Sequence, residues 1–64
     1  MKRLTQRRRE EIANFLQSTR YRASNVESAV LESGPIREKE RDRMISDLYE
    51  CRDYVTRALE ELEA

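Results

Sequence analysis

At 64 residues the chain has room for one small domain, and domains of this size are rarely stable unless a disulfide, a metal or another subunit supports them. Histidine is absent and Cys51 is the one cysteine, which excludes an intrachain disulfide and a zinc site of the Cys/His type. Charged residues make up 41% of the chain and cancel to a net charge of zero, so the strong basic excess of many nucleic-acid binders is missing.

The first predicted element is a long helix over about residues 5–33. No strong helix breaker falls in this range, and Thr5 is a suitable N-cap because its hydroxyl can accept a bond from a free backbone N–H. Small and apolar residues recur at alternating steps of four and three, the pattern of a coiled-coil seam. The members of this seam are Ile12, Leu16, Thr19, Ala23, Val26 and Val30.

The chain's single glycine and single proline stand together at residues 34–35, where they predict a tight turn. Gly34 can adopt the left-handed conformation that ends a helix, and Pro35 suits the first position of the next helix because it has no N–H to leave unpaired. A second helix is predicted over about residues 36–63. Its seam repeats the same spacing with Met44, Leu48, Cys51, Val55, Ala58 and Leu62.

A connection this short makes the two helices antiparallel neighbours, so residues 1–64 are expected to form a single all-α domain, an antiparallel two-helix hairpin. Seam positions whose numbers add to about 70 then lie level with each other. The predicted layers are Val26 with Met44, Ala23 with Leu48, Thr19 with Cys51, Leu16 with Val55, Ile12 with Ala58, and Arg9 with Leu62. The same fold brings the basic residues 7–9 close to Glu60, Glu61 and Glu63.

Further apolar residues lie beside the predicted seam, and a lone hairpin would leave them uncovered. We expect Phe15, Ile45 and Leu59 to form a second stripe through which two hairpins dimerise into a four-helix bundle, although a different helical partner could cover the same stripe. Arg52 interrupts this stripe between Ile45 and Leu59. It either selects the partner by pairing with an acid across the interface, or packs its stem and extends its guanidinium to the rim.

The sequence offers little for catalysis, because it has no histidine for proton transfer, no phosphate-binding glycine loop and no nucleophile motif. Asp47, Glu50 and Asp53 share a helix face, but solvated acids paired with nearby arginines explain them better than a cation site. Cys51 is interpreted as a small buried side chain rather than a redox thiol. We therefore expect no enzyme activity, no cofactor and no small-molecule substrate.

The outward side of the first helix carries mainly uncharged hydrogen-bonding residues flanked by arginines. Arg7, Asn14, Gln17 and Tyr21 form one stripe along it and are the predicted partner-binding residues. Such a stripe could contact a protein, and it could also contact RNA phosphates and bases. An ordinary solvated helix face would have a similar composition, so the stripe defines a candidate site only.

The segment IANFLQS, residues 12–18, is similar to part of the first helix of the Rop (Rom) family. The chain also resembles this family in length and in its predicted two-helix, dimeric layout. Rop proteins are plasmid-encoded RNA-binding proteins that fold as dimeric four-helix bundles and promote pairing of complementary RNA loops. The resemblance implies an RNA contact at Phe15, which falls where the family has its RNA-contacting phenylalanine.

From these features we expect a small non-enzymatic regulatory or adaptor protein that binds another macromolecule through a helix face. Its expected partners are a second copy of itself and another protein, with a Rop-like RNA-binding regulator as the alternative. The chain has no signal-peptide core and no apolar run long enough for a membrane span, and its one cysteine fits a reducing compartment. A cytoplasmic location without membrane contact is therefore expected.

Overall fold

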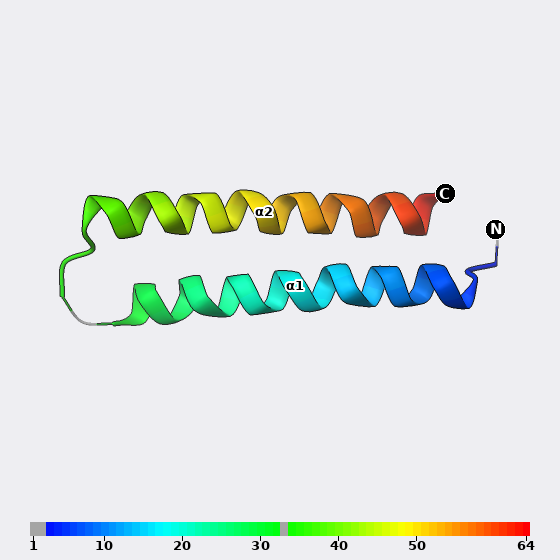
Figure 1. Cartoon of the computed structure of the whole chain (residues 1–64), viewed down its shortest axis with the longest axis horizontal. Helices are drawn as coiled ribbons and strands as arrows, with labels where there is room; N and C mark the ends of the chain where they lie inside the picture. The colour runs from blue at the N-terminus through cyan, green and yellow to red at the C-terminus, as the bar shows by residue number, and fades with distance from the viewer. Residues whose placement is uncertain (1–2, 33) are drawn as a thin grey trace.

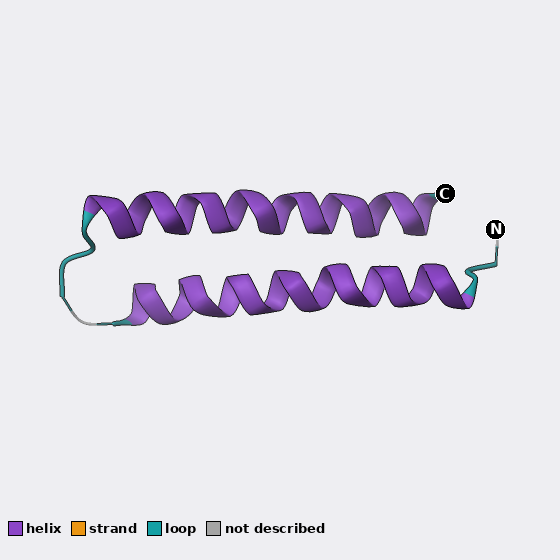
Figure 2. Cartoon of the chain, in the orientation of Figure 1, coloured by secondary structure: helices purple, strands orange, loops and turns teal. Residues whose placement is uncertain are grey.

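The computed structural model describes residues 3–32 and 34–64, and over these it consists of two long antiparallel helices, α1 (Gln6–Leu31) and α2 (Glu38–Glu63), joined by one connection (Figure 1). No strand occurs within the described residues (Figure 2). The hairpin measures 49 × 15 × 14 Å, and both termini lie at the end opposite the connection (Figure 1). The predicted all-α hairpin is therefore confirmed.

The two helices begin differently. Thr5 caps α1, since its side-chain oxygen accepts a hydrogen bond from the backbone N–H of Arg8 at 3.2 Å, as predicted. The N-cap of α2 is Arg37, which makes no side-chain capping bond. Glu38 and Glu40 in the first turn of α2 instead place negative charge where the helix dipole favours it.

The connection is longer than the two-residue turn that the sequence suggested. Gly34 has a positive φ of 117°, as predicted, but it does not end the first helix, because α1 already stops at Leu31 with Glu32 as its C-cap. The placement of Pro35 at the start of the second helix is wrong, because α2 begins at Glu38, after Pro35 and Ile36 have crossed from one helix to the other. The C-cap of α1 is Glu32, and the expected helix end at residue 33 lies outside the described residues.

The residues packed between α1 and α2, here called the seam, follow a heptad that only partly matches the prediction. Ile12, Val26, Cys51 and Ala58 are the buried apolar residues of the described chain, and each was a predicted seam member. The layer of Thr19 and Cys51 is also confirmed, since the thiol donates to the Thr19 carbonyl oxygen at 3.6 Å. In between, the half-buried positions of the seam are Arg8, Phe15, Arg22, Ala29, Asp47, Tyr54 and Glu61.

The layers of Ile12 with Ala58 and of Val26 with Met44 also lie in the seam, since Met44 is half-buried and the other three residues are buried. Three predicted layers are wrong in the hairpin itself: Ala23 with Leu48, Leu16 with Val55, and Arg9 with Leu62. Leu16 and Val55 are 47% and 46% exposed, and Leu48 and Leu62 are 50% and 54% exposed. Ala23 and Arg9 are exposed as well. Both helices carry two overlapping heptads, one containing residues 15 and 54 and the other containing residues 16 and 55. The first one closes the hairpin, because the rings of Phe15 and Tyr54 stack across it at 6.3 Å.

The two sides of the seam belong to two different faces of the hairpin. On one side, Asn25 and Glu32 of α1 line a groove together with Arg43 and Asp47 of α2. Residues four positions after Ile12, Thr19 and Val26 point to the opposite side of α1, and residues four positions after Met44, Cys51 and Ala58 do the same on α2. The hairpin therefore has a polar face, which contains the groove, and a second face. The second face is formed by the residues that were predicted in the seam but are exposed in the hairpin.

Candidate macromolecular interfaces

The second face is apolar along both helices, and we call it the apolar face. Its members are Leu16, Ala23 and Val30 of α1, with Ile45, Leu48, Val55, Leu59 and Leu62 of α2. The seven large side chains among them are 43% to 55% exposed. Scattered exposed apolar residues are ordinary, but a contiguous stripe of this length is typical of an interaction surface.

The outer edge of the apolar face lies on α2, where Arg52 stands between Ile45 and Leu59. Its guanidinium carbon lies 4.7 Å from the centre of the Tyr49 ring on the same helix. Ile45, Leu48, Tyr49 and Arg52 together line a shallow hollow at this edge. Of the two interpretations of Arg52, the geometry of the hairpin favours the rim position, because the cation rests on its own helix. Pairing with an acid of another chain stays a prediction.

Phe15 was expected beside the seam, on the stripe that meets another hairpin. In the structure its ring is half-buried in the seam against Tyr54, so its placement on the outer stripe is corrected. An aromatic ring at a seam position fills the space left by the small Thr19, Cys51 and Ala58. The roles of Ile45, Arg52 and Leu59 in a dimer stay predictions, and all three are exposed in the hairpin.

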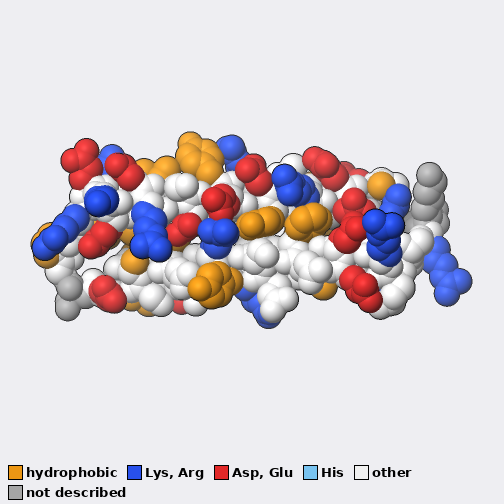
Figure 3. Space-filling view, in the orientation of Figure 1, with side chains coloured by type: hydrophobic (Ala, Val, Ile, Leu, Met, Phe, Trp, Pro, Cys, Tyr) orange, Lys and Arg blue, Asp and Glu red, His pale blue; other side chains and the backbone are white. Residues whose placement is uncertain are grey.

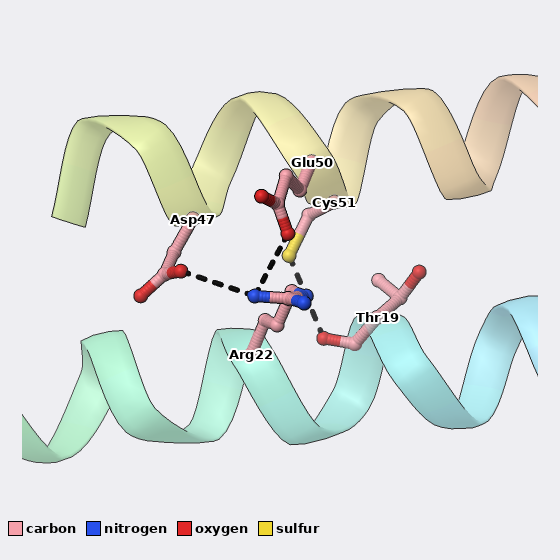
Figure 4. A network of polar contacts seen from close by, with 5 residues as sticks. All are labelled: Thr19, Arg22, Asp47, Glu50 and Cys51. Atoms are coloured by element: carbon pink, nitrogen blue, oxygen red, sulfur yellow. Dashed lines mark hydrogen bonds and ion pairs between the residues drawn. The ribbon is translucent and has the colours of Figure 1, made fainter. Parts of the chain in front are cut away.

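The polar face is crossed by a group of four residues, Arg22, Asp47, Glu50 and Tyr54, here called the Arg22 cluster. One guanidinium nitrogen of Arg22 lies 3.3 Å from Asp47 Oδ1 and 2.8 Å from Glu50 Oε2, as Figure 4 shows. The Arg22 guanidinium also sits 5.9 Å from the centre of the Tyr54 ring. One cation of α1 thus forms ion pairs with carboxylates on two successive turns of α2.

The environment of Arg22 keeps it charged. The neighbouring Tyr54 side chain and the negative charges of Glu50 and Asp47 raise the pKa of the Arg22 guanidinium above its ordinary value, against the opposing effect of partial burial. The sequence interpretation paired these acids with arginines of their own helix. It missed Arg22 because an arginine in a heptad is normally assigned to the solvent-facing side. Arg22 is recognisable as a seam residue only once the pairing of Phe15 with Tyr54 shows which heptad lies between the helices.

Ion pairs continue along the hairpin towards the termini. Arg8 Nε lies 3.6 Å from Glu61 Oε2, which confirms one predicted contact between the basic start and the acidic end of the chain. Arg7 Nε lies 3.4 Å from Glu11 Oε1 on the same helix instead. Acidic and basic side chains alternate over the side of the hairpin seen in Figure 3, and apolar groups appear among them at several places.

The predicted partner-binding stripe of α1, here called the Tyr21 ridge, consists of Arg7, Asn14, Gln17 and Tyr21. All four are exposed, and the Tyr21 side chain reaches 71% exposure. Hollows flank Tyr21 on both sides. One is lined by Gln17, Ser18, Arg22 and Tyr54, and the other by Gln17, Arg20, Ser24 and Asn25, with Tyr21 contributing to each. The ridge therefore offers an aromatic side chain surrounded by hydrogen-bonding groups.

Cys51 is 8% exposed, and the prediction of a buried small side chain is confirmed. Its thiol is occupied by the Thr19 carbonyl oxygen. Among residues 3–32 and 34–64, no three histidine, cysteine, aspartate or glutamate side chains converge in a way that could hold a metal ion. Neither described helix is long and apolar enough to cross a membrane.

Comparisons with protein-family models, with curated proteins and with solved structures give no match for this chain. The likeness to the Rop family consequently rests on the antiparallel two-helix hairpin alone.

Proposed function

We propose that this chain is a non-enzymatic regulatory or adaptor protein that acts by binding other macromolecules through its helix faces, with a protein as the favoured partner. The observation that carries the proposal is the apolar face, whose seven large side chains are about half exposed along both helices. Covering such a stripe with another protein surface stabilises both partners by roughly 25 cal/mol per Å² of apolar area removed from water.

The first partner is a second copy of the chain. Four apolar residues alone fall into the buried class within the described hairpin, which is little for an independently stable fold. Two hairpins that cover each other's apolar faces form a four-helix bundle whose core combines the seam and the apolar face. In this dimer Ile45 and Leu59 contribute to the contact, and Arg52 lies at its rim.

The second partner binds the Tyr21 ridge, which points away from the apolar face and stays accessible in the dimer. Tyrosine and arginine are frequent among the residues that contribute most to protein–protein affinity. Arg7, Asn14, Gln17 and Tyr21 present one such tyrosine, one arginine and two amides on a rigid helix. A protein surface with complementary acceptors and an apolar pocket for the Tyr21 ring fits this arrangement.

RNA is the second candidate for this ridge. The specific feature in its favour is the 71% exposed Tyr21 ring, on which an unpaired base could stack, with Arg20 lining a hollow beside it and Arg7 further along the same ridge. The net charge of zero argues against it. Salt separates the two candidates, because each phosphate contact makes the affinity fall steeply as salt rises.

The experiment compares two tagged proteins as baits in lysate from the source organism, with and without nuclease. The first bait is the wild type and the second carries Arg7→Ala, Asn14→Ala, Gln17→Ala and Tyr21→Ala. The recovered partner is then titrated against both at two salt concentrations. A matched control carries Ser46→Ala, Asp53→Ala, Thr56→Ala and Glu60→Ala, four exposed residues on the outward side of α2.

The proposal requires that the α1 variant lose the partner while its melting curve is unchanged, and that the α2 control retain it. A nuclease-resistant partner with a weak salt dependence supports protein binding. A nuclease-sensitive partner with a steep salt dependence replaces it with the RNA candidate. Equal binding by the wild type and the α1 variant contradicts a role for the Tyr21 ridge.

A further inference from the structure

We propose that two copies of the chain assemble with each α1 beside the partner's α2, so that both connections lie at the same end of the four-helix bundle. This inference rests on the dimer of the proposed function and adds which helices meet. The other arrangement with twofold symmetry places α1 beside the partner's α1, α2 beside the partner's α2, and the two connections at opposite ends.

The size of the apolar face fits a second copy of the chain. The whole side of the hairpin that carries this face has an outline of 49 by 15 Å, a footprint of about 700 Å² per subunit. This is the same order as the roughly 800 Å² of accessible surface that each partner buries in stable protein interfaces. The face runs along most of both helices, so a partner that covers it must itself be long and two helices wide. Another hairpin of this chain has that shape.

The register inside the hairpin transfers unchanged to the contact between subunits in the proposed arrangement. Residues of α1 and α2 lie level when their numbers add to about 70, as the bonded pair Thr19 and Cys51 does. A twofold axis parallel to the helices keeps every height the same. Leu16 is then level with Val55 of the partner subunit, and Ala23 with Leu48 of the partner subunit.

Side-chain size favours the same arrangement. The α1 part of the apolar face and its edge contain Ala13 and Ala23, whereas the α2 part carries the large Ile45, Leu48 and Leu59. Pairing α1 with the partner's α2 sets Ala23 against Leu48 and Ala13 against Leu59, small against large, with one contact of two large side chains where Leu16 meets Val55. Pairing α2 with the partner's α2 sets Leu48 against Val55 and Ile45 against Leu59, large against large. It leaves the two α1 helices with the smaller set of Leu16, Ala23 and Arg20 between them.

Charge also distinguishes the arrangements. Helix α1 has five arginines against three glutamates, a net charge of +2, and α2 has Lys39 and four arginines against nine acids, a net charge of −4. Each contact between α1 and the partner's α2 is attractive, and each contact between like helices is repulsive. Arginines meet at the rim in both arrangements. In the proposed one Arg20 lies near the partner's Arg52, and in the other each of the two lies near its own copy, so their repulsion favours neither arrangement.

The arrangement has a consequence for binding. The two α1 helices occupy diagonal corners of the bundle, so their Tyr21 ridges lie on opposite sides of it. Both α1 helices run in the same direction along the bundle axis. Each ridge then binds one ligand independently, two per dimer. A site composed of both ridges would need the α1 helices to be neighbours.

The test measures distances between the two subunits with spin labels. In a Cys51→Ser background, Arg37→Cys places one label beside the connection, and Asp53→Cys places a control label near mid-length; both positions are exposed. The proposed dimer gives similar distances for the two positions, well below the 49 Å length of the hairpin. A distance near that length for Arg37→Cys alone overturns the arrangement but keeps the dimer. A monomer in sedimentation overturns both.

Cross-linking provides an independent measurement. Chains that carry Ala23→Cys are mixed with chains that carry Leu48→Cys, each in the Cys51→Ser background, and oxidised. The proposed arrangement brings these two positions within disulfide reach between subunits. A mixture of Leu16→Cys and Ala23→Cys chains is the counterpart, and cross-linking there instead would show that the two α1 helices are neighbours. Cys51→Ala serves as the background if Cys51→Ser fails to fold.

Discussion

The two faces of the hairpin differ in how their side chains are satisfied. On the polar face, Arg22 finds two carboxylates and an aromatic ring within the same chain. On the apolar face, residues such as Leu48 and Val55 are half exposed and have no cover in the described hairpin. One well-placed partner can satisfy the hydrogen bonds and charge of a polar group. An apolar stripe is removed from water only by a surface of similar length. The apolar face is therefore the incomplete part of the molecule.

The largest expected effect comes from charging the apolar face. Leu48→Glu with Val55→Glu should weaken the dimer at least about 1000-fold, equivalent to about 4 kcal/mol, because it removes apolar contacts and buries four carboxylates. Sedimentation equilibrium measures the dissociation constant. Ser46→Glu with Thr56→Glu adds the same charge to the outward side of α2 and should leave the dimer intact.

The edge of the same face gives a graded comparison. Ile45→Glu with Leu59→Glu should also weaken the dimer, but less than the Leu48 and Val55 pair, because residues at the rim can keep a carboxylate in water. Equal dissociation constants for the two double variants would place the centre of the contact further out on α2. A dimer unaffected by either one would contradict the apolar face as the contact.

A second prediction compares the seam with the apolar face. Ile12→Ala should lower the free energy of unfolding by about 2 to 5 kcal/mol, since Ile12 is 8% exposed. Leu16→Ala should cost nearly as much, but only because the partner subunit of the proposed dimer covers it, as Leu16 is 47% exposed in the hairpin. Urea denaturation measures both, with the 76% exposed Leu31→Ala as control. A cost below about 1 kcal/mol for Leu16→Ala would contradict a covered apolar face.

A third prediction concerns the Arg22 cluster. Arg22→Met keeps much of the side-chain length but removes the cation that joins Asp47 and Glu50, so the melting temperature should fall. The fall should be smaller than that of Ile12→Ala and should shrink at high salt, because ion pairs of partly exposed groups are screened. Arg20→Met is the matched control on the same helix. Equal melting temperatures for the two variants would show that the cluster adds no stability.

The smallest expected effect is on the Tyr21 ridge. Each alanine substitution at Arg7, Asn14, Gln17 or Tyr21 should change the free energy of unfolding by no more than about 0.5 kcal/mol, because all four side chains face solvent. Thermal melts at a fixed protein concentration check this. A melting temperature that drops clearly for Tyr21→Ala would mean that its ring supports the neighbouring Tyr54, and a loss of binding could then no longer be assigned to the ridge.

The sequence by itself determined the two helices, their antiparallel order and half of the seam. Helix-forming residues run without a breaker to the Gly-Pro pair, and the small or apolar residues at positions 12, 19, 26, 44, 51 and 58 belong to both overlapping heptads. Local propensity and periodicity are properties of the chain alone, so these features needed no tertiary information. The exposure of the Tyr21 ridge followed from the same periodicity.

Tertiary packing alone decided which flank of that shared stripe closes the hairpin. Leu16 and Val55 are the more apolar choice, and a sequence pattern ranks them above Phe15 and Tyr54, above Arg22 with Asp47, and above Arg8 with Glu61. Across the antiparallel seam, however, the rings stack and the cations meet their acids, which satisfies the polar and aromatic groups inside one chain. The hydrophobic effect is non-directional, so any apolar surface that covers Leu16 and Val55 stabilises them. Arg22 and its acids depend on a specific geometry that only the folded hairpin supplies.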